Sequence, residues 1–64
     1  MPTIRVEWFE GRTQAQKAEL ARAITEAVVT IANTTPEAVN IILTDIPKSN
    51  WAHAGKLMEP VKAE

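Results

Sequence analysis

The sequence has no cysteine, and this absence excludes disulfide bonds and thiolate sites. It also has a single histidine, His53. A zinc site would therefore need carboxylates as its other ligands, and none is suitably spaced. We expect no metal, and a chain without cysteine fits a reducing compartment.

Long apolar runs are also missing, and no stretch approaches the length that spans a membrane. The N-terminus lacks the charged and apolar regions of a signal peptide. Neither charge dominates, because seven basic and eight acidic residues are mixed along the chain, for a net charge of −1. Without a basic patch, nucleic acid is not an expected partner. We expect a soluble, cytoplasmic protein without a membrane partner.

The chain is also short. Its 64 residues allow one domain at most, so residues 1–64 are interpreted as a single domain. Below about 70–80 residues, an apolar core rarely suffices without disulfides, a metal or association with other chains. The sequence has no cysteines for disulfides and no suitably spaced ligands for a metal, so association with other chains is expected.

Two regular elements are predicted in the first half of the chain. Residues 3–9 alternate between apolar and polar side chains over most of their length, which predicts a strand. After a break at Glu10-Gly11-Arg12, Thr13 stands three residues before Gln16, the spacing of a capping box. A helix over 14–32 is therefore predicted. Its apolar face carries Leu20, Ala21, Ile24, Ala27, Val28 and Ile31.

The second half predicts one more strand and a hairpin. Residues 40–46 are apolar on both faces in their middle, which is typical of a strand buried on both sides. After a turn at 47–50, residues 51–56 form a short extended or hairpin segment, and residues 57–64 are a loose polar tail. The predicted fold is α+β: a single βαβ unit with two parallel strands and one long helix, plus a short C-terminal hairpin.

This architecture itself favours assembly. One helix covers only one face of a two-stranded sheet, and such a sheet is marginally stable alone. The free strand edges and the uncovered apolar face call for other copies of the chain. The sequence therefore predicts a homo-oligomer.

Few groups in the sequence exchange protons near neutral pH. If Met1 is removed, Pro2 carries a secondary amine, and α-amino groups have a pKa of roughly 7.7–8.0. Proline is also tolerated at a strand edge, so a structural role for Pro2 stays open. For His53 the preferred interpretation is a surface or interface position. A catalytic group of Ser49, His53 and Asp45 would be chance proximity in a turn.

Arg12 stands beside the predicted helix cap, where the helix dipole favours anions over cations. An arginine in this place is consistent with binding an anionic group together with the helix end. A solvated surface charge is the alternative. Trp8 and Trp51 are interpreted as core or interface fillers rather than stacking platforms.

The Met-Pro start and the segment Glu10-Gly11-Arg12-Thr13 with Gln16-Lys17 resemble the 4-oxalocrotonate tautomerase family. The resemblance covers nearly the whole chain, including Ile41–Thr44, Lys48–Trp51 and Gly55. It implies a hexamer, a trimer of dimers, with active sites built from neighbouring subunits. It also implies a cofactor-independent isomerase of small enol or keto acids, of the 2-hydroxy-dienoate or enolpyruvate type.

The resemblance further implies roles for individual residues. Pro2 matches the catalytic proline, a general base, and Arg12 matches an arginine that binds the substrate carboxylate. Trp51 and Phe9 match positions that line the pocket. Asn40 stands where the best-known members have a second arginine, and its amide stabilises a developing enolate less than a charge would. We therefore expect a tautomerase that prefers monoacids such as aryl enolpyruvates.

Two alternatives remain open from the sequence. A dehalogenase-like or hydratase-like relative would act on unsaturated acids and would need a further carboxylate to activate water. The sequence does not place one. A non-catalytic assembly subunit would use Pro2 only structurally. Retention of Met1 would favour this last alternative, because the amide nitrogen of Pro2 would then have no basic lone pair.

Overall fold

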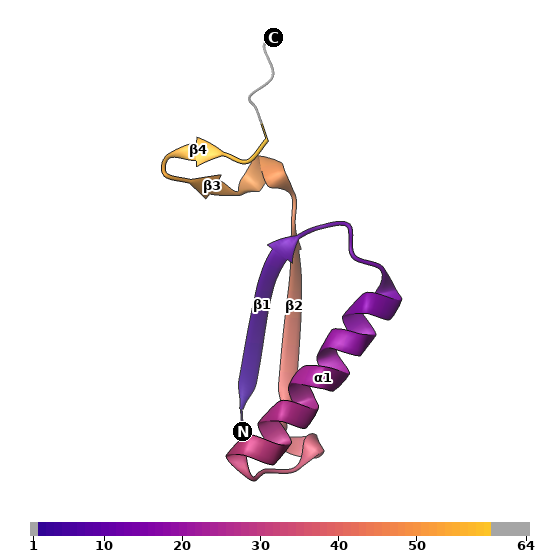
Figure 1. Ribbon diagram of the computed structural model, residues 1–64. Helices are drawn as coiled ribbons and strands as arrows, with labels where there is room; N and C mark the ends of the chain where they lie inside the picture. Colours follow the sequence, from indigo (N-terminus) through magenta and orange to yellow (C-terminus); the bar gives the residue numbers. More distant parts are fainter. Residues whose placement is uncertain (1, 60–64) are drawn as a thin grey trace.

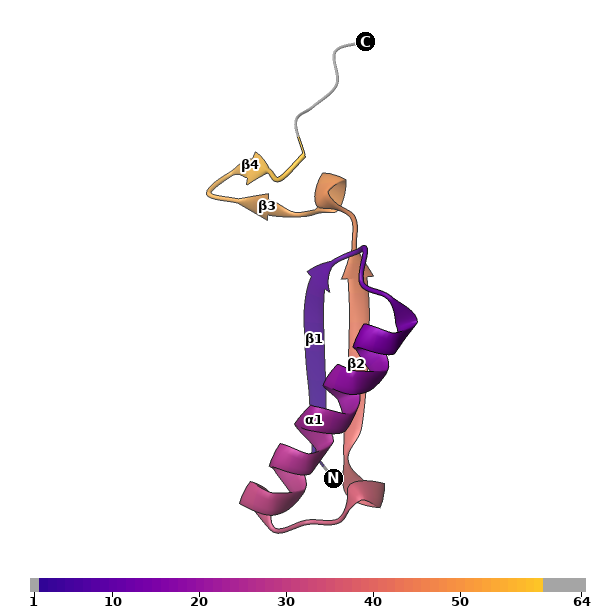
Figure 2. The same cartoon turned by 45° about the vertical axis from the view of Figure 1, so that its right-hand side comes forward.

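The computed structural model describes residues 2–59, which form one βαβ unit followed by a short hairpin. Strands β1 and β2 lie side by side, and α1 packs across one face of the pair, over β2 (Figures 1 and 2). In chain order the elements are β1 (Thr3–Phe9), α1 (Gln14–Ala32), the 3-10 helix η1 (Pro36–Ala38), β2 (Asn40–Ile46), the 3-10 helix η2 (Lys48–Asn50), β3 (Ala52–His53) and β4 (Lys56–Leu57). The predicted α+β architecture is confirmed.

Strands β1 and β2 pair in parallel from Thr3 opposite Asn40 to Phe9 opposite Ile46. Since side chains alternate along a strand, every second pair shares a face. The face toward α1 carries the pairs Ile4/Ile41, Val6/Leu43 and Trp8/Asp45. At its end, Asp45 binds Lys17 of α1 at 2.5 Å, a contact that joins the helix to the sheet. The opposite face carries Arg5/Ile42, Glu7/Thr44 and Phe9/Ile46 and has no helix over it (Figure 2).

Helix α1 begins and ends where the sequence predicts. The Thr13 side chain accepts a hydrogen bond from the Gln16 backbone, and the Gln16 side chain accepts one from the Thr13 backbone. This capping box satisfies donors that the first helical turn leaves free. Asn33 ends the helix in the left-handed conformation, at φ 55°. On the exposed face, Arg22 forms ion pairs with Glu19 and with Glu26.

The apolar stripe of α1 is wider than the sheet beneath it. Leu20, Ala21, Ile24 and Val28 are half-buried, whereas Ala27 is exposed and Ile31 is 84% exposed. Near the end of the helix, an apolar hollow of about 230 Å³ is lined by Ala27, Val28, Ile31 and Ala32.

The prediction that β2 is buried on both faces is wrong for a single chain. Ile41 and Leu43 are half-buried under the helix, but Ile42 on the opposite face is 44% exposed. Within residues 2–59 no helix covers that face, where Trp51 contacts only its Phe9 end, and no side chain in this range is fully buried.

The hairpin extends two residues beyond its predicted range. The turn residues Ala54 and Gly55 both have positive φ, 53° and 81°, as a type I′ hairpin turn requires. Leu57 belongs to β4, and the Met58 backbone N–H donates to the Trp51 carbonyl at 2.7 Å. Residues 57 and 58 are therefore held in the hairpin, contrary to the prediction of a loose tail from residue 57. The predicted tail over 60–64 lies outside the described residues.

The chain is elongated rather than compact. Its radius of gyration is 15.8 Å and its extents are 53 × 25 × 14 Å, whereas a compact domain of this length would have a radius of gyration of about 11 Å. No helix in the described part of the chain is long and apolar enough to cross a membrane. Residues 2–59 of a single chain therefore have no fully buried core.

We expect the protein to sediment as an oligomer at micromolar concentration, because only association buries the uncovered face of the sheet. Ile42→Glu should shift the distribution toward smaller species. A charge at this 44% exposed position would cost little in a monomer but would be buried in an assembly. The matched control is Thr30→Glu, at an exposed helix position. A stable folded monomer of 7.1 kDa for the parent protein would contradict this account.

Candidate functional site

The predicted site residues lie in two groups at opposite ends of the sheet. Pro2 and Asn40 stand at the start of the two strands, where the Asn40 backbone N–H donates to the Pro2 carbonyl at 3.0 Å. Phe9, Arg12 and Trp51 stand at the far end. From Pro2 to Phe9 the strand advances about 23 Å, at roughly 3.3 Å per residue. One chain therefore brings the second group together but keeps it apart from Pro2 and Asn40.

Pro2 is half-buried at the foot of β1. Proline fits this place because the first residue of a strand need not donate to the ladder. Its carbonyl accepts the bond from Asn40, which ties the Pro2 backbone to the start of β2. The Asn40 side chain is exposed at the same end of the sheet.

Arg12 is held in place by the turn that follows β1. Gly11 has φ of 121°, which side chains rarely allow, and this turn leads directly into the helix cap. The Arg12 Nη1 donates to the Phe9 carbonyl at 2.8 Å. Its guanidinium carbon lies 5.0 Å from the centroid of the Trp8 ring, a cation–π contact. The guanidinium is thus fixed close to the N-terminal end of α1, where anions are favoured.

Two aromatic rings form the other part of this end of the sheet. The Phe9 and Trp51 rings lie 4.6 Å apart between centroids, at 59° to each other. Lys48 Nζ lies 5.5 Å from the centroid of the Phe9 ring and adds a positive charge there. Phe9 and Trp8 are neighbours on an alternating strand, so the aromatic pair and Arg12 flank opposite faces of the sheet end.

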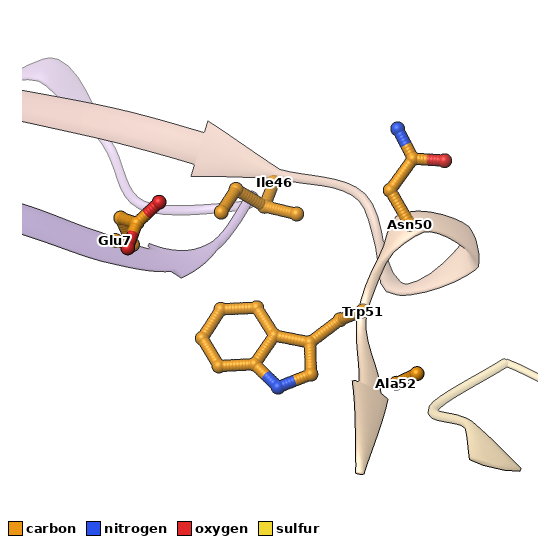
Figure 3. Close-up of a pocket in the computed structure, with 5 residues that line it drawn as sticks. All are labelled: Glu7, Ile46, Asn50, Trp51 and Ala52. Carbon is orange, nitrogen blue, oxygen red and sulfur yellow. The ribbon is translucent and has the colours of Figure 1, made fainter. Parts of the chain in front are cut away.

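A hollow of about 240 Å³ opens beside Trp51. It is lined by Glu7, Ile46, Asn50, Trp51 and Ala52, and Figure 3 shows the Trp51 indole extending toward Ile46 and Glu7. The arrangement offers an apolar wall for a planar substrate and one acidic group. Sequence reasoning missed Glu7, although it alternates onto the same face as Phe9, and this periodicity was the signal that could have identified it.

Asp45 has structural partners rather than catalytic ones. It accepts hydrogen bonds from Lys17 Nζ at 2.5 Å and from Trp8 Nε1 at 2.7 Å. The Lys17 bond, followed by the Trp8 bond, lowers the pKa of the Asp45 carboxyl below its usual value. Within residues 2–59 Asp45 makes no hydrogen bond to Ser49 or His53, so the structure gives no support to a Ser/His/Asp group. Trp8 was interpreted from the sequence as a core or interface residue, and its ring also contacts the Arg12 guanidinium.

In the range 2–59, no three histidine, aspartate or glutamate side chains are grouped as ligands for a metal ion. The polar groups at the Arg12 end of the sheet instead suit a small organic acid. Arg12 provides planar hydrogen-bond donors and positive charge, and Phe9 and Trp51 provide apolar surface.

Comparisons with known proteins agree with this fold. A family model described as tautomerase enzyme matches residues 2–60. A probable tautomerase of Ralstonia nicotianae is 44% identical over 57 residues, which cover 89% of this chain and 88% of the relative. A probable tautomerase of Streptococcus agalactiae is 40% identical over 57 residues, covering 89% of this chain and 95% of the relative.

Solved structures show the same similarity. YwhB, a homologue of 4-oxalocrotonate tautomerase, matches with a TM-score of 0.88 at 31% identity, over 95% of this chain and all of that one. A heterohexamer 4-oxalocrotonate tautomerase from Chloroflexus aurantiacus matches with a TM-score of 0.84 at 34% identity, over 91% of this chain and 94% of that one. The chain therefore belongs to the tautomerase family, among the short relatives of 4-oxalocrotonate tautomerase.

Proposed function

We propose that the protein is a cofactor-independent tautomerase that interconverts the enol and keto forms of small 2-hydroxy-dienoate or enolpyruvate-type acids. The observation that carries the proposal is the group at the end of β1, where an arginine with fixed geometry flanks one face of the sheet and an aromatic hollow opens on the other. Such a group suits a planar acid, with its carboxylate on Arg12 and its apolar part against Trp51. Family membership supports the reaction class.

The proposed site is completed by a second copy of the chain. Within residues 2–59, β1 pairs only with β2, so its other edge is free to pair. A two-fold axis would run the free edges of two β1 strands against each other in opposite directions. This pairing would bring Pro2 of one copy to the Phe9 end of the other. We propose a homohexamer, a trimer of dimers, and the heterohexameric structural relative supports this size.

In the proposed reaction Pro2, freed by removal of Met1, is the general base. Its secondary amine takes the proton of the enol hydroxyl, and the electrons of that bond form the ketone. The electrons of the carbon–carbon double bond then take a proton at carbon from the protonated amine, so the amine is regenerated. Arg12 holds the carboxylate throughout. An α-amino group suits this exchange because its pKa of roughly 7.7–8.0 lies near neutral pH.

Two features support monoacids as the preferred substrates. Asn40 offers an amide without charge at the Pro2 end of the site, where a second carboxylate would need a cation. Glu7 adds an acidic side chain beside Trp51 in the hollow (Figure 3). A second carboxylate on the substrate would be repelled there, whereas the ring of an aryl enolpyruvate would pack against the indole.

The role of Pro2 is tested with processed protein on phenylenolpyruvate, an aryl enolpyruvate whose ketonisation is followed by ultraviolet absorbance. Blocking the amine by retention of Met1 should lower kcat by about 10²–10⁴-fold, the usual contribution of a positioned general base. Mass spectrometry verifies the state of the N-terminus, and circular dichroism verifies the fold. Full activity with Met1 attached would refute the mechanism.

The role of Asn40 is tested by Asn40→Arg, with the parent protein as reference, on phenylenolpyruvate and on a 2-hydroxy-dienoate diacid. An added cation should raise kcat/KM for the diacid selectively, by about tenfold for each 1.4 kcal/mol by which it stabilises the transition state. Thr30→Arg is a matched control, because it adds the same charge at an exposed position of α1. An equal response of both substrates, or a parent enzyme that already prefers the diacid, would contradict the proposed role.

A hydratase-like reaction on unsaturated acids is the second candidate, because Glu7 supplies a carboxylate close to the aromatic hollow. We expect proton NMR of the products to show only the keto isomer, and we expect Glu7→Gln to retain tautomerase activity. The conservative amide keeps the size of the side chain and removes only its charge. A product that carries a new hydroxyl on a saturated carbon, and that Glu7→Gln no longer forms, would favour the second candidate instead.

A further inference from the structure

Arg12 rests on a series of contacts that reaches across the whole βαβ unit. Its guanidinium lies 5.0 Å from the centroid of the Trp8 ring. The Trp8 indole N–H donates to Asp45 Oδ1 at 2.7 Å, and Asp45 Oδ2 accepts from Lys17 Nζ at 2.5 Å. The series therefore links the loop before α1 to β1, to β2 and back to α1.

The contact with Trp8 leaves the binding groups of Arg12 available. A guanidinium is planar, and its five N–H donors lie in that plane, so its edge binds carboxylates while its face stacks on an aromatic ring. One Nη1 donor is used by the Phe9 carbonyl. Among residues 2–59 only the Phe9 carbonyl takes a hydrogen bond from Arg12, so the contact with Trp8 leaves donors for a substrate carboxylate. It restricts a flexible side chain before the substrate arrives, which reduces the entropy lost on binding.

Asp45 has two effects in this series. Its hydrogen bond fixes the rotation of the Trp8 ring, so the ring presents a defined face to Arg12. The Asp45 carboxylate also attracts the Arg12 guanidinium electrostatically, and the bond to Lys17 limits this competition because the lysine balances the charge of Asp45. The side chains of Lys17 and Asp45 are only 24% and 33% exposed, which keeps the pair in place.

We propose that Trp8 is a positioning residue that orients Arg12 for the substrate carboxylate, and that Asp45 holds Trp8 in the orientation required. This inference rests on the proposed function, in which Arg12 binds that carboxylate. Trp8 itself touches no reacting atom. Its effect should therefore appear in KM and should depend on the presence of Arg12.

The test is a double-mutant cycle of Trp8→Leu and Arg12→Ala on phenylenolpyruvate, with ketonisation followed by ultraviolet absorbance. Arg12→Ala should raise KM about ten- to hundredfold, because it removes a charge-assisted contact. Trp8→Leu should raise KM about two- to fivefold with kcat nearly unchanged. In the Arg12→Ala background, Trp8→Leu should add nothing, because the arginine that it positions is absent.

Leu20→Ala is the matched control for loss of packing under the helix, since Leu20 is half-buried on α1. It should leave KM unchanged in the folded protein. An equal rise in KM from Trp8→Leu with and without Arg12 would overturn the inference. A second result would also overturn the inference: Trp8→Leu leaves KM unchanged while Arg12→Ala raises KM. The proposed function would stand in that case. An unchanged KM for Arg12→Ala would overturn the proposed role of Arg12 and this inference with it.

A second measurement needs no variant at the tryptophan. In the parent protein the side-chain protons of Arg12, assigned by their absence in Arg12→Ala, should be shifted upfield in the NMR spectrum by the indole ring. Asp45→Leu removes the acceptor of the indole N–H and should reduce this shift. Arg12 protons at the positions of an unstructured arginine in the parent protein would overturn the inference even if Trp8→Leu fails to fold.

Discussion

A two-stranded sheet with one helix can cover only one of its faces, and the rest of this structure depends on that limit. The hydrophobic effect needs apolar surface to leave water, yet among residues 2–59 no side chain is fully buried. Ile42 on the open face and Ile31 at the end of α1 remain exposed. A single chain thus leaves apolar surface exposed that a complete domain would bury. Its elongated shape has the same origin, because the hairpin stands beyond the sheet instead of folding onto it (Figure 1).

The same limit separates the functional groups. A parallel pair of strands carries Pro2 at one end and Arg12 with Trp51 at the other, and no bend in β1 brings them together. Assembly then serves two purposes in this account, since it buries the open face and joins the two halves of the site. Each half is prepared within its own chain. Pro2 is fixed by its bond to Asn40, and Arg12 is fixed by Phe9 and Trp8. Binding a small acid therefore requires little further ordering.

The elements of the fold could be predicted because their signals are local. Alternation defined β1, and the capping box of Thr13 and Gln16 defined the start of α1. The hairpin end was less well predicted, because the Met58 to Trp51 bond depends on a turn with positive φ at Ala54, a conformation that alanine does not signal. The contacts of Asp45 were not predictable either. They require the register that places Trp8 opposite Asp45, and the crossing of α1 that brings Lys17 there. Pro2 and Arg12 were singled out by their own chemistry and position, whereas Asn40, Phe9 and Trp51 were assigned as site residues through family resemblance; the roles of all five are proposals.

The central claim is that each active site draws Pro2 from one chain and Arg12 from another. The most direct test is to unfold a variant with a blocked Pro2 amine together with Arg12→Ala, and to refold them as a mixture. The account predicts that the mixture exceeds the mean activity of the two variants refolded separately. In an equal mixture, a site shared between two chains receives an intact Pro2 in about half of the cases and, independently, an intact Arg12 in about half. About a quarter of the sites should therefore be intact. A mixture whose activity equals that mean would show that Pro2 and Arg12 of a working site come from the same chain, and would contradict the account.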